Sequence, residues 1–291
     1  MTKALTPDQI VSYRANGYLA PIDALSAGEV QKYRDELAMT EAHLGGSLMA
    51  IDKKYRGNWH FMCRWVDELA RHPRIVDAVE DLLGPDLLLY TSRFFIKEAK
   101  SEGIAAWHQD STYFGLRPYD HVTAWVALCD VTPETGPVEF AVGSHIRGQL
   151  MQKSGVIQNS VNTAGQIIVE WFDQSQIARA ILRPGQFSLH HTCTVHQSAP
   201  NRSAERRIGL ALSYIPTRTR YIGSRKMPAC LIRGQDDYHH FDLQPPPQQD
   251  FGAVEMQRHE TSFKAYLESF YEQLDIAEKN MPPDVAATLM N

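Results

Sequence analysis

The chain has 291 residues, of which 43% are hydrophobic and 22% charged, and its formal net charge is −5. This composition is ordinary for a globular protein and excludes a disordered chain, and the acidic balance argues against a general nucleic-acid-binding or basic membrane-surface protein. No segment approaches the roughly 18 uninterrupted apolar residues of a transmembrane helix, and the first residues do not have the pattern of a secretory signal. The four cysteines are far apart and form no C-x-x-C pair. We therefore expect a cytoplasmic protein with reduced thiols.

Capping signals predict helices in the first third of the chain. The segments Thr6–Gln9 and Ser26–Glu29 each match a capping box, in which the side chains of the N-cap and N3 residues bond each other's backbone amides. We expect the first helix to end at Gly17 and the second to run to about His43. A third helix is predicted over residues 73–84, because its apolar positions lie on one helical face. The first third of the chain is therefore expected to be mainly helical.

From Leu87 onward the pattern predicts short strands separated by Gly, Pro, Ser and Asp. The expected strands are Leu87–Tyr90, Phe94–Ile96, Val122–Cys129, Val138–Val142, Ile167–Glu170, Phe187–Leu189 and Ile208–Ile215. Residues 53–67 show no clear period, residues 231–250 are expected to form a long extended loop, and residues 253–279 a final helix. This order predicts an α+β fold, a β-sandwich or barrel buttressed by helices. We expect one domain over residues 1–291, with a helical part at about 1–86, a β core at about 87–216 and a loop and helix at about 217–291.

The most informative stretch is Trp107–Phe114, which reads WHQDSTYF. Successive side chains alternate between the faces of a strand, so His108 and Asp110 should project together and Gln109 should project oppositely. An imidazole beside a carboxylate provides two ligands of the 2-His-1-carboxylate set of non-heme Fe(II) oxygenases. A hydrogen-bonded His–Asp pair without a metal is the alternative. The iron interpretation requires a further histidine from a strand adjacent in space.

A second stretch, residues 184–207, supplies a histidine followed by an arginine: His196 and Arg207. Fe(II) held by three protein ligands keeps three open positions, and 2-oxoglutarate fills two of them through its keto oxygen and C1 carboxylate. Its distal C5 carboxylate needs a buried cation, and arginine binds a carboxylate in a bidentate manner better than lysine does. An arginine on the strand after the distal histidine is well placed for this.

Several motifs together resemble the phytanoyl-CoA dioxygenase family of Fe(II)/2-oxoglutarate oxygenases. They are His108-Gln109-Asp110 followed by Tyr113, Arg117-Pro118 and Trp125, then Thr135–Phe140 leading to Gly143-Ser144-His145, and finally His196-x-Ser198-x-x-Asn201-x-Ser203-x-x-x-Arg207. The resemblance runs in order from about Thr6 to Pro216. One departure is Val142, which stands where the family usually has a proline, in a turn.

The resemblance implies a fold, a set of cofactors and a set of site residues. The fold is a double-stranded β-helix, a jelly roll whose mouth holds the metal, and the cofactors are Fe(II), 2-oxoglutarate and O₂. It implies iron binding by His108, Asp110 and His196, binding of the C5 carboxylate by Arg207 with Ser198, and a cosubstrate pocket lined by Trp125. Gln109, Lys97 and Tyr90 are further candidates for contact with the cosubstrate.

Other residues could take these roles. His190 or His191 could be the distal ligand, although the motif spacing favours His196, and we expect them to be a packed strand residue and a surface residue. Arg206 could replace Arg207, but strand alternation allows only one of the two to point inward. We expect His145 in a structural turn and His239 and His240 in solvent. The arginines that could approach an anionic substrate, although each is more often a surface or ion-paired residue, are Arg117, Arg218, Arg220 and Arg233.

The function expected from this resemblance is hydroxylation of an unactivated C–H bond, coupled to conversion of 2-oxoglutarate to succinate and CO₂. The presence of Asp110 disfavours halogenation, because the related halogenases lack this carboxylate. A jelly-roll metal hydrolase or isomerase and a non-catalytic ligand-binding jelly roll are the alternatives. The expected substrate is a small polar or secondary metabolite, on the ground that residues 113–121 and 217–233, taken to form the mouth, mix aromatic residues with arginines.

Overall fold

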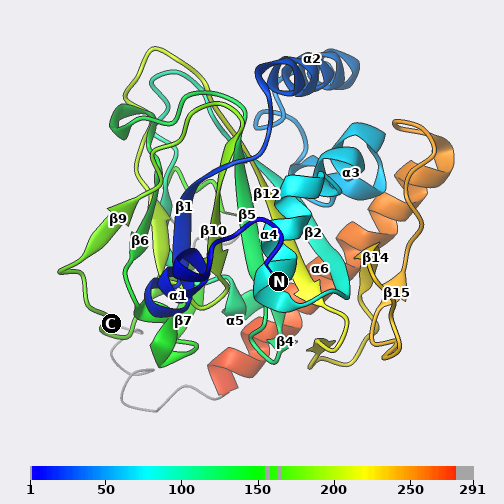
Figure 1. The fold of residues 1–291 in the computed structure, drawn as a ribbon. Coiled ribbons are helices and arrows are strands. Elements are labelled where there is room, and N and C mark those ends of the chain that lie inside the picture. The colour runs from blue at the N-terminus through cyan, green and yellow to red at the C-terminus, as the bar shows by residue number, and fades with distance from the viewer. Residues whose placement is uncertain (1, 155–157, 163–165, 280–291) are drawn as a thin grey trace.

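The computed structural model describes residues 2–154, 158–162 and 166–279 (Figure 1). The helices are α1 (Pro7–Asn16), α2 (Ala27–Leu44), α3 (Arg64–Ala70), α4 (Pro73–Leu83), α5 (Ser111–Phe114) and α6 (Ala253–Lys279), with 3-10 turns at Lys53–Arg56, Trp59–Phe61, Pro133–Thr135 and Ser144–Arg147. The longer strands are β1 (Tyr18–Asp23), β2 (Leu87–Lys97), β5 (Val122–Ala127), β10 (Gln186–His191), β12 (Arg207–Pro216) and β14 (Pro228–Arg233). The shorter strands are β3 (Ala105–His108), β4 (Leu116–Arg117), β6 (Val138–Ala141), β7 (Gln152–Ser154), β8 (Gln166–Ile168), β9 (Ile177–Arg179), β11 (His196–Ser198), β13 (Arg220–Tyr221) and β15 (Asp242–Leu243).

Two sheets face each other and form a double-stranded β-helix. The larger sheet has seven strands in the order β1-β10-β5-β12-β2-β14-β15, and the smaller has four in the order β3-β11-β6-β9. Neighbouring strands are antiparallel except for the short β14–β15 pair. The mixture of helices and antiparallel sheets confirms the expected α+β jelly roll with buttressing helices.

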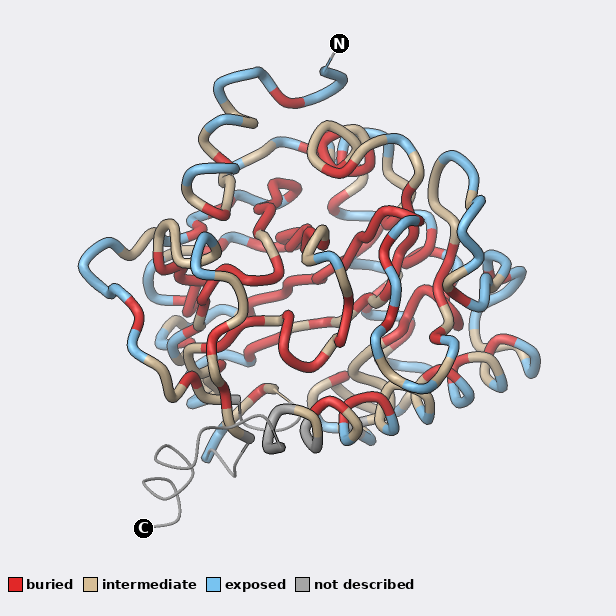
Figure 2. The backbone as a smooth tube through the Cα atoms, turned by 90° about the horizontal axis from the view of Figure 1, so that it is seen from below, coloured by how far each residue is buried: buried red, intermediate tan, exposed pale blue. Residues whose placement is uncertain are grey.

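The larger sheet buries a different kind of side chain on each face. Along β12, Leu210 and Leu212 belong to the main hydrophobic core, which also contains buried residues of α2, α3 and α4. Ala211 and Ser213, which alternate with them, line a cavity between the two sheets. Figure 2 shows this distribution as buried strands at the centre and exposed loops at the periphery. Because side chains alternate along a strand, one face of the larger sheet packs in the hydrophobic core and the other lines the cavity.

The predicted helix starts are confirmed at Thr6 and Ser26, where both capping boxes are formed. The structure differs from the expectation for β2, which is one continuous strand rather than two. The interruption in its apolar pattern comes from Thr91 and Arg93, which are polar because they face the cavity. Strand β1 was not expected, and its Pro21 lies at a register shift on the edge of the larger sheet, where a missing N–H is tolerated.

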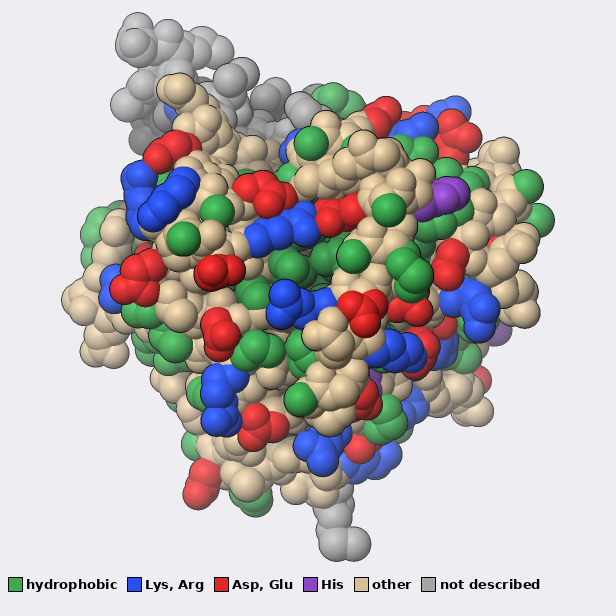
Figure 3. Space-filling view, turned by 90° about the horizontal axis from the view of Figure 1, so that it is seen from above, with side chains coloured by type: hydrophobic (Ala, Val, Ile, Leu, Met, Phe, Trp, Pro, Cys, Tyr) green, Lys and Arg blue, Asp and Glu red, His purple; other side chains and the backbone are tan. Residues whose placement is uncertain are grey.

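Two stretches expected to be irregular contain regular elements. Helix α3 begins after Cys63, which makes no side-chain cap bond, so the sequence carries no start signal there. Residues 231–250 include the end of β14 and the two-residue strand β15, which pairs with Pro228 and Ala229 at the start of β14. None of the described helices combines the length and apolarity needed to cross a membrane. The face drawn in Figure 3 has acidic and basic side chains interspersed.

Candidate metal and cosubstrate site

The two candidate histidine ligands lie on neighbouring strands of the smaller sheet. His108 ends β3 and His196 begins β11, the two residues are register partners, and their ring centroids are 4.1 Å apart. Nδ1 of His108 lies 2.8 Å from the carbonyl oxygen of Ala106, and Nδ1 of His196 lies 2.9 Å from that of Thr194. A carbonyl only accepts, so each Nδ1 carries the proton and each Nε2 keeps a lone pair. Burial lowers the pKa of both imidazoles, which favours the neutral form that binds a metal.

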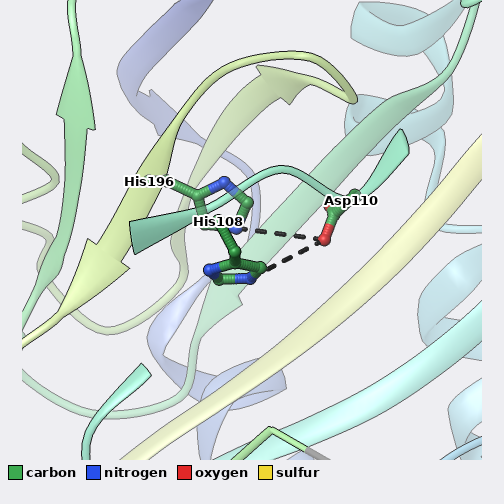
Figure 4. A group of neighbouring side chains, drawn as sticks. All are labelled: His108, Asp110 and His196. Atoms are coloured by element: carbon green, nitrogen blue, oxygen red, sulfur yellow. Dashed lines mark ion pairs between the residues drawn. The ribbon is translucent and has the colours of Figure 1, made fainter. Parts of the chain in front are cut away.

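Asp110 directs one carboxylate oxygen at both histidines. Strand β3 ends at His108, so Asp110 lies just beyond it, as the residue that precedes α5. Its Oδ1 is 4.0 Å from Nε2 of His108 and 3.9 Å from Nε2 of His196, and Figure 4 shows both rings converging on this oxygen. The three donor atoms lie within 4.8 Å of one another. Two neutral imidazoles and a carboxylate at this separation fit Fe(II), with further coordination positions left open.

The second oxygen of Asp110 contacts two side chains of the larger sheet. Oγ1 of Thr123 donates to Oδ2 at 3.3 Å, and Nε2 of His190 lies 3.5 Å from the same oxygen. His190 and Thr123 are register partners on β10 and β5, and both are buried. The carboxylate is therefore held so that one oxygen remains for the metal. Ser188 and His190 alternate with apolar residues along β10, a pattern that indicates polar side chains on one face of this strand. The pattern does not identify Asp110 as the residue that His190 contacts.

Replacing His190 by phenylalanine is expected to weaken Fe(II) binding by roughly 10- to 100-fold, the usual effect of removing a residue that orients a metal ligand. The His190→Gln variant keeps an N–H donor and should recover part of this loss. Anaerobic calorimetric titration with Fe(II) measures both values. The control is His191→Gln, because that side chain points to the other face of β10. Equal Fe(II) affinity in His190→Phe and the native protein would show that the contact has no role in positioning.

Arg207 is buried at one end of the same cavity, with 1% of its surface exposed. One Nη donates to Oγ of Ser198 at 3.0 Å and to the carbonyl of Gly136, and the guanidinium lies 5.3 Å from the ring centroid of Trp125. Its Nε has no hydrogen-bond partner among the described residues. Gly209 makes room for Trp125, since a Cβ at that position would lie 1.9 Å from the indole. The buried, incompletely bonded guanidinium fits an anion.

Arg206 points to the opposite face of β12. It forms ion pairs with Glu41 at 2.5 Å and with Glu98 at 3.1 Å, outside the cavity. The two adjacent arginines thus show the alternation expected of a strand, with Arg207 as the inward residue.

Lys97 provides a second buried basic group beside Arg207. The two residues are register partners on β2 and β12, and Nζ of Lys97 donates to Oγ of Ser198 at 2.5 Å. Burial and the neighbouring guanidinium lower the pKa of Lys97 to about 6. Within the described part of the chain, no carboxylate lies at ion-pair distance from Lys97 or Arg207. Two buried basic groups without an acid fit the C5 carboxylate of 2-oxoglutarate.

The sequence model of the phytanoyl-CoA dioxygenase (PhyH) family matches residues 13–209, about two-thirds of the chain. The chain belongs to this family. It is 24% identical over 235 residues to the L-proline trans-4-hydroxylase of Streptomyces griseoviridis, a match that spans 71% of this chain and 85% of that protein. Membership of this family confirms that the protein is a non-heme iron, 2-oxoglutarate-dependent oxygenase that uses Fe(II), 2-oxoglutarate and O₂.

Solved structures of related enzymes agree with the fold. The non-heme monooxygenase ThoJ superposes with a TM-score of 0.78 at 29% identity, covering 94% of this chain and 100% of that one. The epimerase SnoN, solved with Fe³⁺, alpha ketoglutarate and nogalamycin RO, superposes with a TM-score of 0.60 at 26% identity, covering 74% of this chain and 84% of that one. Related chains therefore include both a hydroxylase and an epimerase.

In this PhyH-family chain, two of the cosubstrate candidates lie away from the cavity. The amide of Gln109 is fully buried and joins two backbone segments, accepting from the N–H of Leu150 at 2.7 Å and donating to the carbonyls of Gly148 at 2.9 Å and Cys193 at 2.6 Å. The ring of Tyr90 packs edge-on against Phe114 and Phe241, in a separate hydrophobic cluster. Gln109 and Tyr90 therefore make structural contacts and do not line the cavity.

The arginines suggested for the substrate also lie elsewhere. Arg117 stacks on Tyr119 at 4.1 Å, Arg218 pairs with Asp120 at 2.7 Å, Arg233 pairs with Asp77 and Glu80 at 2.6 Å, and Arg220 is exposed. No residue of 217–233 is among the described residues that line the cavity. Tyr113 and Phe114, from the expected mouth segment 113–121, do line the cavity, together with residues 57–58 and parts of β2 and α6. Sequence reasoning did not identify Arg93, Thr91 or Asn58 as residues that line the cavity.

Proposed function

We propose that this enzyme hydroxylates an unactivated C–H bond of a small-molecule substrate while 2-oxoglutarate is converted to succinate and CO₂. One arrangement carries this proposal. The convergent donor atoms of His108, Asp110 and His196 share a cavity with the buried guanidinium of Arg207, beside which lies the buried Lys97. Fe(II) bound by the three ligands would supply the centre at which O₂ is activated.

The remaining roles belong to the protein's own residues. Arg207 and Ser198 bind the C5 carboxylate, Lys97 donates a hydrogen bond to the Ser198 hydroxyl beside them, and Trp125 forms the pocket wall. Thr123 and His190 hold the second oxygen of Asp110, which keeps the first directed at the metal. The burial of all these groups limits access of water, which strengthens each charge-assisted contact.

Two features of the site argue against other reactions. A zinc hydrolase or isomerase would have no use for a buried guanidinium beside the metal ligands that has no acidic partner among the described residues. A purely ligand-binding jelly roll would have no use for two histidines whose Nε2 atoms converge on one carboxylate oxygen. Asp110 occupies the position that the related halogenases leave open. Epimerisation is the remaining alternative, because SnoN is an epimerase, and it would leave the product without an added oxygen atom.

Incubating the purified enzyme with Fe(II), ascorbate and 2-oxoglutarate, with and without a panel of small metabolites, tests the proposal. We expect succinate to form slowly on its own and faster with a substrate, whose product gains one oxygen atom per succinate. A product isomeric with its substrate would replace hydroxylation by epimerisation. Absence of succinate throughout the panel would contradict the proposed function.

A further inference from the structure

Three aromatic side chains line the cavity on the side of helices α5 and α6. They are Phe114 of α5 and Phe263 and Tyr266 of α6, which together we call the aromatic wall. Each ring is only partly buried by the protein, so some of its surface stays open to the cavity. Helix α6 lies outside residues 13–209, which match the family, so two of the three rings come from a segment that the family model does not include. Uncovered aromatic surface in a cavity favours a ligand with an apolar part.

A row of three hydroxyl side chains leads from the iron site towards this wall. Thr123, Ser213 and Thr91 are register partners on the adjacent strands β5, β12 and β2, and all three line the cavity. Oγ1 of Thr123 lies 3.3 Å from Oδ2 of Asp110 and 3.3 Å from Oγ of Ser213. At the other end of the row, Oγ1 of Thr91 donates to the side-chain oxygen of Asn58 at 2.8 Å. These hydroxyl groups are therefore engaged with other protein groups.

Helix α6 is fixed against the end of this row. The side-chain amide of Asn58 donates to Oγ of Ser262, in the first part of the helix, at 2.8 Å. Further along the helix, the ring of Phe270 stacks on that of Tyr113 of α5, with their centroids 4.9 Å apart. The two α6 rings of the aromatic wall lie between these contacts in the sequence. The wall is therefore held in place at the level of the iron ligands and does not have to form when a ligand binds.

Arg93 adds a charged side chain to the same cavity, and it is engaged with protein groups. It donates to the carbonyl of Val161 at 3.4 Å, and its guanidinium lies 5.4 Å from the ring centroid of Phe95. Binding of an apolar group at the aromatic wall does not require a contact with this guanidinium.

We propose that the substrate carries an apolar ring or hydrocarbon body that packs against the aromatic wall, and that Phe263 and Tyr266 set the specificity for it. This inference rests on the proposed function, because it concerns the substrate of the same site. A molecule covered with hydroxyl or charged groups would lose its hydration at the wall without gaining hydrogen bonds there, which disfavours a small polar metabolite. The C–H bond to be oxidised then belongs to the apolar body, next to the iron ligands.

A matched pair of ring compounds tests this contact. Cyclohexanol and myo-inositol share the same carbocycle, but myo-inositol carries a hydroxyl group on every carbon. Each is titrated calorimetrically into the full chain loaded with Fe(II) and 2-oxoglutarate, in the absence of O₂. We expect cyclohexanol to bind at least roughly 10-fold more tightly, because each hydroxyl group buried without a partner weakens binding roughly 5- to 150-fold.

Variants of α6 test whether the aromatic wall provides this preference. Phe263→Ala and Tyr266→Ala should each weaken cyclohexanol binding roughly 2- to 12-fold, the effect of losing about 20–60 Å² of apolar contact. Tyr266→Phe keeps the ring and should bind cyclohexanol as tightly as the native protein does. The matched control is Tyr271→Ala, since Tyr271 lies on the same helix with 66% of its surface exposed, and its loss should leave the affinity unchanged.

Equal affinities for the two compounds, tighter binding of myo-inositol, or no binding of cyclohexanol would each overturn the inference. So would an unchanged affinity for cyclohexanol in both alanine variants. A loss in Tyr266→Phe as large as that in Tyr266→Ala would also overturn it, because the hydroxyl group rather than the ring would then bind the ligand. The comparison of the two compounds uses the native protein, so it remains decisive if an alanine variant fails to fold.

Succinate formation by the native protein without substrate is measured in parallel. If succinate forms and cyclohexanol is not preferred, only the substrate inference fails. If no succinate forms, the proposed function fails.

Discussion

The His108→Ala and His196→Ala variants are expected to bind Fe(II) more than roughly 100-fold more weakly than the native enzyme and to lose all turnover of 2-oxoglutarate. Each substitution removes one of three metal–protein bonds, a larger loss than that of an orienting contact. The fold should survive, because both residues lie at the cavity rather than in the main hydrophobic core. Anaerobic titration with Fe(II), together with circular dichroism and thermal melting, measures affinity and fold separately.

Asp110→Ala belongs to the same experiment and should abolish hydroxylation, because an exchangeable ligand would replace the carboxylate. His240→Ala, in a surface loop, is the matched control and should bind iron normally. Full activity in either histidine variant, or full hydroxylation by Asp110→Ala, would reject the corresponding residue as a ligand.

The Arg207→Ala variant is expected to raise the apparent KM for 2-oxoglutarate by roughly 30-fold to several thousand-fold. Truncating one partner of a buried, hydrogen-bonded charge pair costs roughly 2–5 kcal/mol, and each 1.4 kcal/mol or so is a factor of ten. Fe(II) affinity measured without 2-oxoglutarate should be nearly unchanged, since the three metal ligands remain. Steady-state kinetics with varied 2-oxoglutarate, combined with the iron titration, measures both quantities.

Arg206→Ala provides the adjacent control. Arg206 pairs with Glu41 and Glu98 on the other face of β12, so its loss should barely change the KM for 2-oxoglutarate. An unchanged KM in Arg207→Ala would remove the basis for assigning the cosubstrate to the cavity end formed by Arg207.

Features encoded by neighbouring residues were predictable from the sequence. The capping boxes at Thr6 and Ser26 form as expected, because such a box needs only residues three apart. The bounds of α6 also agree with the expected helix over 253–279. The convergence of His108, Asp110 and His196 followed from strand alternation together with the family resemblance, although β3 ends before Asp110.

Features that depend on which strands become neighbours were not predictable. His190 contacts Asp110 only because β10 pairs with β5 and the smaller sheet packs across them, and no local pattern specifies that pairing. Arg93 interrupts an apolar run, which in the sequence resembles a break between two strands rather than a residue facing a cavity. Phe263 and Tyr266 of α6 line the cavity, but their spacing along the helix is also that of core-facing residues, so the sequence does not distinguish the two positions. Tyr90 and Gln109 lie on or beside site-forming strands, but their side chains face away from the cavity.

Turnover under ¹⁸O₂ tests the central claim, that this chain activates O₂ at a His108–Asp110–His196 iron site to oxidise 2-oxoglutarate. The enzyme is incubated with Fe(II), ascorbate, catalase and 2-oxoglutarate, and the succinate is analysed by mass spectrometry. Oxidative decarboxylation transfers one atom of O₂ to succinate, so we expect one ¹⁸O atom per succinate with the native enzyme. We expect no labelled succinate with His196→Ala or when Zn²⁺ replaces Fe(II). Absence of succinate with the native enzyme, or equal labelling by His196→Ala, would contradict this account.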